Sequence, residues 1–185
     1  MIGRQPLCDF QQPSKIAVSV KASLRVEGSL IILDYLVCGD LALIDFEQKQ
    51  PAAPNPIRGH NLWKQTCFEA FWGFQNDPQY WELNVSANRS WNVYHFSDYR
   101  QTMKEEPAIQ AIDCKIIIQT ATEFNLQVCV QLPTNSRKNN LLEFNLCAVL
   151  KPSAAEDNCY FAIQHAPKKP DFHFRSAFLS YDEKK

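Results

Sequence analysis

Acidic, amide and aromatic side chains alternate with apolar ones in two neighbouring stretches of the chain, and these residues have the most potential for chemistry. Glu69 and Phe71 alternate with apolar residues in the first stretch, and Tyr80, Glu82 and Asn84 do so in the second. Residues two apart in a β-strand share a face. We therefore expect these five side chains on one side of a sheet. An apolar set should lie on the other side, made of Phe68, Ala70, Trp72, Phe74, Trp81, Leu83 and Val85.

Carboxylates and amides beside flat aromatic rings suit a sugar or another polyhydroxylated ligand. The rings cover the apolar CH faces of such a ligand, while Glu and Asn side chains exchange hydrogen bonds with its hydroxyls. Asn92 and Tyr94 can extend this surface on the next strand, because they alternate with Val93 and His95. The alternative is an ordinary solvated face, since polar residues on one side of an antiparallel sheet are expected without any function.

Catalytic and metal-binding interpretations have less support. Glu69 and Glu82 could form an acid–base pair if they are adjacent across strands, because two close carboxylates push their pKa values apart. Cys67 beside His95 would be a nucleophile candidate only if the thiol were reachable, and it lies in an apolar run. The sequence contains no GxSxG nucleophile elbow, HExxH zinc motif or phosphate-binding glycine loop. A metal set would have to come from Asp171, His173 and His165.

Apolar residues at every second position predict the β-strands that hold these polar and aromatic side chains. Apolar residues occupy every second position from Ile16 to Val26, and a turn at Glu27-Gly28 leads into residues 29–38, so the pair is predicted to be a hairpin. The same alternation returns from Phe124 to Leu132. Further strands are expected over residues 66–74, 80–86, 91–96, 112–119, 142–150, 159–164 and 173–179, which makes about ten in all.

Strands at short intervals without helices predict an all-β, two-sheet antiparallel β-sandwich. The best helical candidate, Tyr99 to Ala111, is interrupted by Pro107. Residues 47–61 are rich in proline and are predicted to form a long loop. No boundary or repeat divides the chain, so residues 1–185 are expected to form a single domain.

The composition of the chain limits the binding partners and the cellular compartment that we expect for it. Nineteen basic residues against twenty acidic ones give a formal net charge of -1, which argues against nucleic acid as a partner. No apolar stretch is long enough for a membrane helix or a signal peptide, so no membrane partner is expected. The seven cysteines are odd in number and include no CxxC pair. Reduced thiols in the cytoplasm are the expected state.

Several runs carry a resemblance to a known family. They are residues 62–71 (LWKQTCFEAF), 80–86 (YWELNVS), 91–96 (WNVYHF), 98–100 (DYR) and 165–173 (HAPKKPDFH). Together they resemble bacterial DOMON-like domain proteins over most of the chain, although residues 86–89 replace a Ser-Pro and a glycine that relatives tend to show. The resemblance implies a two-sheet sandwich similar to family 9 carbohydrate-binding modules and to the haem domains of some dehydrogenases.

The resemblance also implies a site. In the sugar-binding relatives, aromatic rings clamp one end of the sugar, and acidic, amide and Arg side chains bind its hydroxyls. By that resemblance the ligand-binding residues here are Glu69, Glu82, Asn84, Trp91, Tyr94 and Arg100. Trp63 could be a lid over this site or an anchor for the long loop. The expected function is non-enzymatic binding of a small carbohydrate-like ligand on a concave sheet face, without a cofactor.

Two alternatives stay open. The haem-binding relatives use a Met and a His or Lys as axial ligands, and Met103 lies in a suitable loop; its partner would be His60, His95, His165 or His173, although no spacing specifies an iron site. The other alternative is a protein–protein interaction module that uses a sheet edge or the aromatic face, for example in a homodimer.

Overall fold

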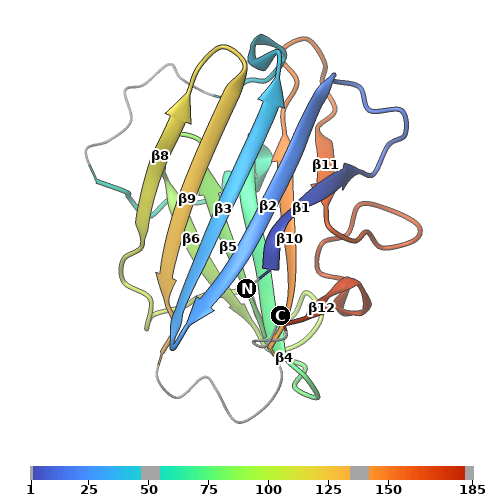
Figure 1. Ribbon diagram of the computed structural model, residues 1–185. Coiled ribbons are helices and arrows are strands. Elements are labelled where there is room, and N and C mark those ends of the chain that lie inside the picture. The colour runs from blue at the N-terminus through green and yellow to red at the C-terminus, as the bar shows by residue number, and fades with distance from the viewer. Residues whose placement is uncertain (1, 47–54, 134–141, 182–185) are drawn as a thin grey trace.

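β-Strands dominate the protein, in line with the alternation in its sequence (Figure 1). The structure is a computed structural model that describes residues 2–46, 55–133 and 142–181. The predicted loop over 47–61 is thus described only from residue 55 onward. The described elements are β1 (Ile2–Asp9), β2 (Val18–Glu27), β3 (Leu30–Gly39), η1 (Leu41–Leu43), η2 (Leu62–Lys64), β4 (Cys67–Phe74), β5 (Tyr80–Ser86), β6 (Trp91–Phe96), β7 (Lys104–Glu105), β8 (Asp113–Gln119), β9 (Glu123–Gln131), β10 (Leu142–Leu150), β11 (Cys159–Ala162), η3 (Arg175–Ala177) and β12 (Leu179–Ser180).

The strands form one continuous antiparallel sheet that curls on itself. Its order is β7-β6-β5-β4-β10-β11-β1-β2-β3-β9-β8, and β12 pairs with β10 beside this path. β1 joins the two halves, because Leu7 pairs with Val20 of β2 while Cys8 pairs with Ala162 of β11. In Figure 1 the half that contains β2, β3, β8 and β9 lies in front of the half that contains β4, β5, β6 and β10.

The all-β prediction is confirmed, and its details need correction. The described chain has twelve strands rather than about ten, and they belong to one hydrogen-bonded sheet rather than two separate ones. β1 was not predicted from the sequence. Its four successive residues from Gly3 to Pro6 are exposed, so the strand lacks the alternation of buried and exposed positions that marks the other strands. The strand predicted over 173–179 is wrong: this segment forms η3 and reaches the sheet only at Leu179–Ser180.

The predicted first hairpin is confirmed. Glu27 pairs with Leu30 across a two-residue turn, and the pairing continues to Val18 and Gly39 at the far end. Gly28 has φ +58°, a left-handed conformation that a residue without Cβ adopts at little cost. Turn chemistry and strand alternation therefore agree on the register of these two strands.

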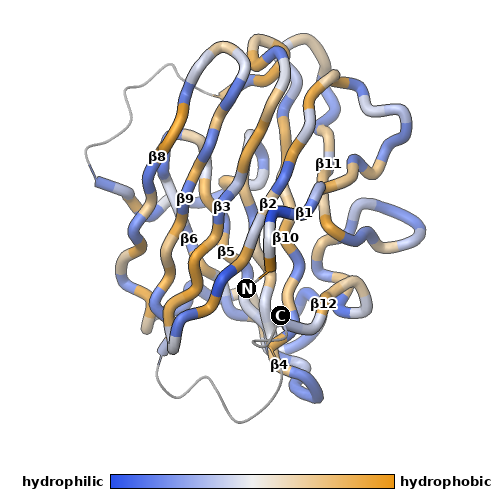
Figure 2. The backbone as a smooth tube through the Cα atoms, in the orientation of Figure 1, coloured by the Kyte–Doolittle hydropathy of each residue, from blue (hydrophilic) through white to orange (hydrophobic). Residues whose placement is uncertain are grey.

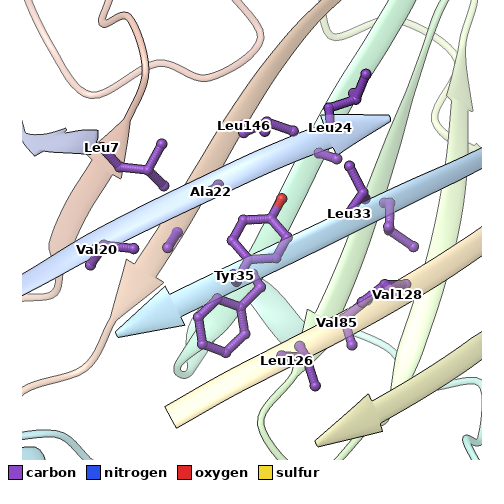
Figure 3. Close-up of a cluster of buried hydrophobic side chains, with 14 of the residues drawn as sticks. Leu7, Val20, Ala22, Leu24, Leu33, Tyr35, Val85, Leu126, Val128 and Leu146 are labelled. Atoms are coloured by element: carbon purple, nitrogen blue, oxygen red, sulfur yellow. The ribbon is translucent and has the colours of Figure 1, made fainter. Parts of the chain in front are cut away.

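The main core fills the space between the two halves of the curled sheet. Figure 3 shows part of it, where Val20, Leu33 and Leu126 of the front half meet Val85 and Leu146 of the back half. Figure 2 shows hydrophobic residues following the strands, while the loops beside β11 and β12 are largely hydrophilic. The described helices are three residues long, and none could cross a membrane.

One buried hydrogen bond ties the two halves together. Tyr35 of β3 is 1% exposed and donates its hydroxyl to the main-chain oxygen of Glu69 in β4 at 2.6 Å. The same ring packs 5.3 Å from that of Phe68. The position of β4 is thereby fixed against the front half of the sheet.

Trp91 lies in this core and not on the outer face, which corrects its place among the predicted ligand-binding residues. It pairs with Val85, packs within the main core and is 2% exposed. Arg58 stacks on its ring, 4.5 Å from the centroid. Alternation along β6 requires this outcome, because Asn92 and Tyr94 face the other way.

We expect Trp91→Ala to lower the free energy of unfolding by about 3–5 kcal/mol, the usual result of emptying a buried aromatic site. Ile117→Ala is the control, since Ile117 is 51% exposed, and it should cost less than about 1 kcal/mol. Urea denaturation followed by circular dichroism measures both. A Trp91→Ala variant as stable as the control would place this side chain outside the core.

Candidate functional site

The outer face of β4, β5 and β6 carries the acidic and amide groups together, as the alternation predicted. Glu69 pairs with Asn84, and Glu82 pairs with Phe71 on one side and Tyr94 on the other. In the same register, the apolar residues that alternate with these polar ones along β4 and β5 face the core. The prediction that these polar residues share one face is therefore confirmed.

This face is covered rather than open to solvent. The segment 170–173, the turn after β6 and helix η2 close over it and leave a pocket of about 330 Å³. A second, smaller hydrophobic cluster that includes Phe71, Tyr94 and Phe172 packs around it. The residues that line the pocket are Trp63, Glu69, Phe71, Glu82, Phe96, Arg100, Met103, Val149, Tyr160, Pro170, Phe172 and His173.

Two buried glutamates form the floor of the pocket. Glu69 is 3% exposed and Glu82 is 4% exposed. Asn84 donates from Nδ2 to Glu82 Oε1 at 2.7 Å, whereas Glu69 Oε1 is buried with no hydrogen-bond partner in the described part of the chain. A buried oxygen without a partner costs free energy, so a ligand that donated a hydrogen bond to it would offset that cost.

Burial raises the pKa of both glutamates. The pKa of Glu82 rises to about 7, although the hydrogen bond from Asn84 and the charge of Arg100 both favour its carboxylate. The pKa of Glu69 rises well above its usual value, first through burial and then through the charge of Glu82. Near neutral pH the pair therefore holds a proton that two exposed glutamates would release.

His173 lies close to Glu82 and is neutral near pH 7. Its Nδ1 lies 2.8 Å from the hydroxyl of Tyr80, and that hydroxyl also accepts from the Arg100 main-chain N–H at 3.0 Å. The direction of the bond between Tyr80 and Nδ1 depends on the tautomer of the ring, and the second ring nitrogen, Nε2, lies 3.7 Å from Glu82 Oε2. Burial, together with the charge of Arg100, lowers the pKa of His173 to about 4.

An ion pair at the rim of the pocket holds the covering segments together. Arg100, in the left-handed region at φ 53°, donates from Nη2 to Asp171 Oδ1 at 2.9 Å, and Tyr99 donates to Oδ2 of the same carboxylate at 2.5 Å. Burial alone would raise the pKa of Asp171, but these hydrogen bonds outweigh it and lower that pKa. Asp171 thus joins the turn after β6 to the C-terminal segment.

Aromatic rings form the walls. Trp63 is partly exposed and packs edge-on against Tyr94, with the ring centroids 5.8 Å apart. The ring centroid of Phe71 lies 6.2 Å from that of Phe172. Of the two roles suggested for Trp63, the structure favours a place at the pocket, since this residue lines it.

The sequence-predicted residues divide into three groups. Glu69, Glu82 and Arg100 line the pocket, and Trp91 lies on the far side of the sheet. Asn84 and Tyr94 lie on the same face but do not line the pocket. Asn84 orients Glu82, and the Tyr94 hydroxyl accepts from Asn92 Nδ2 at 3.1 Å.

Phe96, Tyr160 and Phe172 also line the pocket but were not predicted as site residues. His173 lines it too, although it was considered only as a haem or metal ligand. Phe96 could have been found, because it continues the alternation of Asn92 and Tyr94 along β6. No local signal marks Tyr160 and Phe172, which reach the pocket from β11 and the C-terminal segment.

The structure brings Glu69 and Glu82 together in the pocket floor, as an acid–base pair would require, but it does not assemble the nucleophile or the metal site considered from the sequence. Cys67 is fully buried, burial raises its thiol pKa well above the usual value, and His95 lies on the opposite face of the sheet, paired with Trp81. Asp171 binds Arg100, while His165 Nε2 contacts the main-chain oxygen of Cys8. No group of three or more metal-binding side chains occurs among the described residues.

A larger hollow of about 410 Å³ lies beside η1 and the turn between β8 and β9. Its polar groups serve local structure: Asp40 caps η1 by accepting from Ala42 N, and Thr120 Oγ1 accepts from Glu123 N. In the described chain none of its side-chain N or O atoms is both buried and unpartnered. The smaller pocket is therefore the better candidate site.

Comparison with known proteins identifies the fold alone. No protein-family model matches the chain, and the search of curated proteins gave no match. A protein from Bacteroides uniformis, described as a candidate carbohydrate-binding protein, has a similar structure with a TM-score of 0.69 and 13% identity, over 98% of this chain and 87% of its own. A family 9 carbohydrate-binding module from Caldicellulosiruptor kristjanssonii, solved with glucose, gives a TM-score of 0.52 and 10% identity, over 91% and 78%.

We expect Glu82→Gln to become more stable relative to the wild type as the pH rises from 5 to 8, by up to about 3 kcal/mol. Between about pH 4.5 and 7 folded Glu82 keeps a proton that the unfolded chain has released, so its contribution to stability is present at low pH and lost as the pH rises. His173 acts in the opposite direction, since its stabilising contribution is lost as the pH falls from 6.5 toward about 4.

The difference between variant and wild type removes the His173 contribution, because both chains retain His173, and reports on Glu82 together with its influence on Glu69. Urea denaturation at each pH gives this difference. The exposed Glu27→Gln variant is the matched control and should show a difference that does not change with pH. A Glu82→Gln difference as flat as that of the control would contradict the burial of an ionisable pair.

Proposed function

We propose that this protein is a non-enzymatic binding domain for a small carbohydrate-like ligand, held in the pocket over β4, β5 and β6. The observation that carries the proposal is the buried, partnerless oxygen of Glu69 in a pocket walled by aromatic rings. The volume of about 330 Å³ lies at the lower end of the range of small-molecule sites, which is about 300–1,000 Å³. A single sugar ring is a ligand of suitable size.

Each part of the pocket has a role in this function. Trp63 and Phe172 offer apolar surface to the CH face of a sugar ring. Glu69 and Glu82 accept hydrogen bonds from hydroxyl groups, and Arg100 at the rim can donate to a ring or glycosidic oxygen. Because the rim is tied by Asp171, these groups are held in place before the ligand arrives, which lowers the entropic cost of binding.

The fold is consistent with the same proposal. We infer a DOMON-like β-sandwich, in which the two halves of the curled sheet act as the two sheets. The likeness to a family 9 carbohydrate-binding module supports this architecture. Fold similarity by itself does not establish function, so the argument for sugar binding depends on the pocket.

We expect a screen of monosaccharides and short oligosaccharides to yield at least one ligand that raises the melting temperature and shifts tryptophan fluorescence. Trp63→Ala should weaken its binding about tenfold or more and abolish most of the fluorescence shift, because Trp63 is the partly exposed tryptophan that lines the pocket. Isothermal titration calorimetry measures the affinity.

Lys64→Ala is the matched control for this test. Lys64 is the exposed neighbour of Trp63 in η2 and does not line the pocket, so this variant should bind like the wild type. A broad screen in which no sugar changes either the melting temperature or the fluorescence would rule out the proposal.

Haem binding is the second candidate, and one observation favours it: Met103 and His173, a pair of the kind that haem-binding relatives use, both line the pocket. The rest of the pocket does not fit the group. Glu69 and Glu82, both buried, would face an apolar macrocycle that offers their carboxyl groups no hydrogen-bond donor.

We therefore expect purified protein to be colourless and to show no Soret band after haem is added. Absorption spectroscopy of the wild type and of His173→Ala makes this test. A Soret band in the wild type that disappears in His173→Ala would establish the haem alternative and displace the carbohydrate proposal.

A further inference from the structure

Acidic side chains outnumber basic ones in and around the pocket. Glu69 and Glu82 are both buried in it, and Asp171 lies at its rim. Arg100 is the one cationic side chain among the described residues that line the pocket, and its guanidinium is bound to Asp171. Lys169 approaches the outer oxygen of Asp171 at 3.9 Å but is 69% exposed. Three carboxyl groups therefore face one paired guanidinium and one solvated ammonium.

The other groups packed around the two glutamates supply no positive charge. They are Cys67 of β4, Tyr80 of β5, Tyr94 of β6, Cys147 of β10 and His173 of the C-terminal segment. Burial raises the thiol pKa of both cysteines well above its usual value and raises the phenol pKa of both tyrosines, so these four side chains are uncharged near neutral pH. His173 is also neutral there, because burial lowers its pKa to about 4.

Glu69 is the group with the least compensation. Its Oε1 has no hydrogen-bond partner within the described chain, and although a hydrogen bond with the Cys67 thiol favours the carboxylate, no cation contributes to its electrostatic environment. Glu82 has Asn84 at one oxygen, while its second oxygen faces His173 Nε2 at 3.7 Å, which is beyond hydrogen-bonding distance. In the absence of a ligand a shared proton must reduce the charge of the pair.

We propose that the ligand supplies the missing positive charge as a protonated amino group seated against Glu69 and Glu82, so that the preferred ligand class is an amino sugar with a free amine. This inference depends on the carbohydrate function proposed above and names the ligand class of that site.

An ammonium group matches the chemistry of the pocket floor better than a hydroxyl. It has three donors and no acceptor, so it complements a floor whose two carboxyl groups offer acceptors, one of them without a partner. Phe71 pairs with Glu82 across the sheet and adds an aromatic ring to the same floor, where a cation is favoured by the ring quadrupole. The hydroxyls and CH face of the sugar then meet Arg100 and Trp63.

The ammonium group takes over the role of the shared proton. Below neutral pH the glutamate pair must release that proton when the charged ligand binds, whereas a neutral sugar requires no such release. Affinity for an amino sugar should therefore increase between pH 5 and pH 7, and binding at pH 6 should release protons into the buffer.

The test compares glucosamine, N-acetylglucosamine, glucose and ethanolamine by isothermal titration calorimetry with the wild-type chain. Glucosamine should bind about tenfold to a hundredfold more tightly than glucose or N-acetylglucosamine at pH 7, the range expected for a hydrogen bond to a charged group. Its binding enthalpy at pH 6 should differ between two buffers of different ionisation enthalpy. Amine buffers are avoided because they could compete for the site.

Glu69→Gln keeps the shape of the side chain and removes its charge. In this variant the preference for glucosamine over glucose should fall below about threefold, and the pH dependence should flatten. Glu27→Gln, on the exposed first hairpin, should retain both properties. A Glu69→Gln variant that keeps the full preference would overturn the proposed role of this residue.

The outcomes separate the two proposals. Equal affinity for glucosamine and glucose would overturn the amino-sugar inference and leave carbohydrate binding intact. Ethanolamine binding as tightly as glucosamine would show a site for amines in general and would overturn the amino-sugar assignment. If none of the sugars binds, and a broader glycan screen also fails, the carbohydrate function itself is wrong.

Discussion

The hydrogen-bonded register of β4, β5 and β6 fixes both the hydrophobic core and the pocket, because each of these strands contributes side chains to both. One face of these strands supplies Phe68, Leu83 and Trp91 to the main core, and the other supplies Glu69 and Glu82 to the pocket. Both faces are fixed by a single register, because side chains alternate with a period of two. A slip of one residue would place two carboxyl groups in the core, so the hydrophobic core protects the geometry of the site.

Burying the carboxyl groups takes a second layer of structure. The C-terminal segment and the turn after β6 cover the sheet, and the contacts of Asp171 with Arg100 and Tyr99 hold these two segments together. Desolvation of Glu69 and Glu82 works against stability, since a buried ionisable group costs free energy unless it is paired. Perturbed carboxyl groups in a pocket are typical of sites that bind or transform a ligand, where such a cost is offset by the ligand.

The comparisons and the pocket support different parts of the interpretation. The structures from Bacteroides uniformis and Caldicellulosiruptor kristjanssonii share the curled antiparallel fold at identities of 13% and 10%. Side chains change freely at such distances, so the contents of a site have to be read from the chain itself. In this chain they are two acidic groups beneath aromatic rings, with a neutral imidazole above them, and this combination carries the argument for the ligand.

Most of the strands, the first hairpin and the face shared by Glu69 and Glu82 can be predicted from the sequence, because alternation and turn chemistry are local properties. Alternation also indicates that Trp91 points away from Tyr94, although the family resemblance outweighed this evidence in the prediction. The junction of the two halves at β1 and the covering of the pocket by His173 and Phe172 become visible only in the folded chain. These contacts join segments that are far apart in the chain, and their packing leaves no period in the local sequence from which they could be predicted.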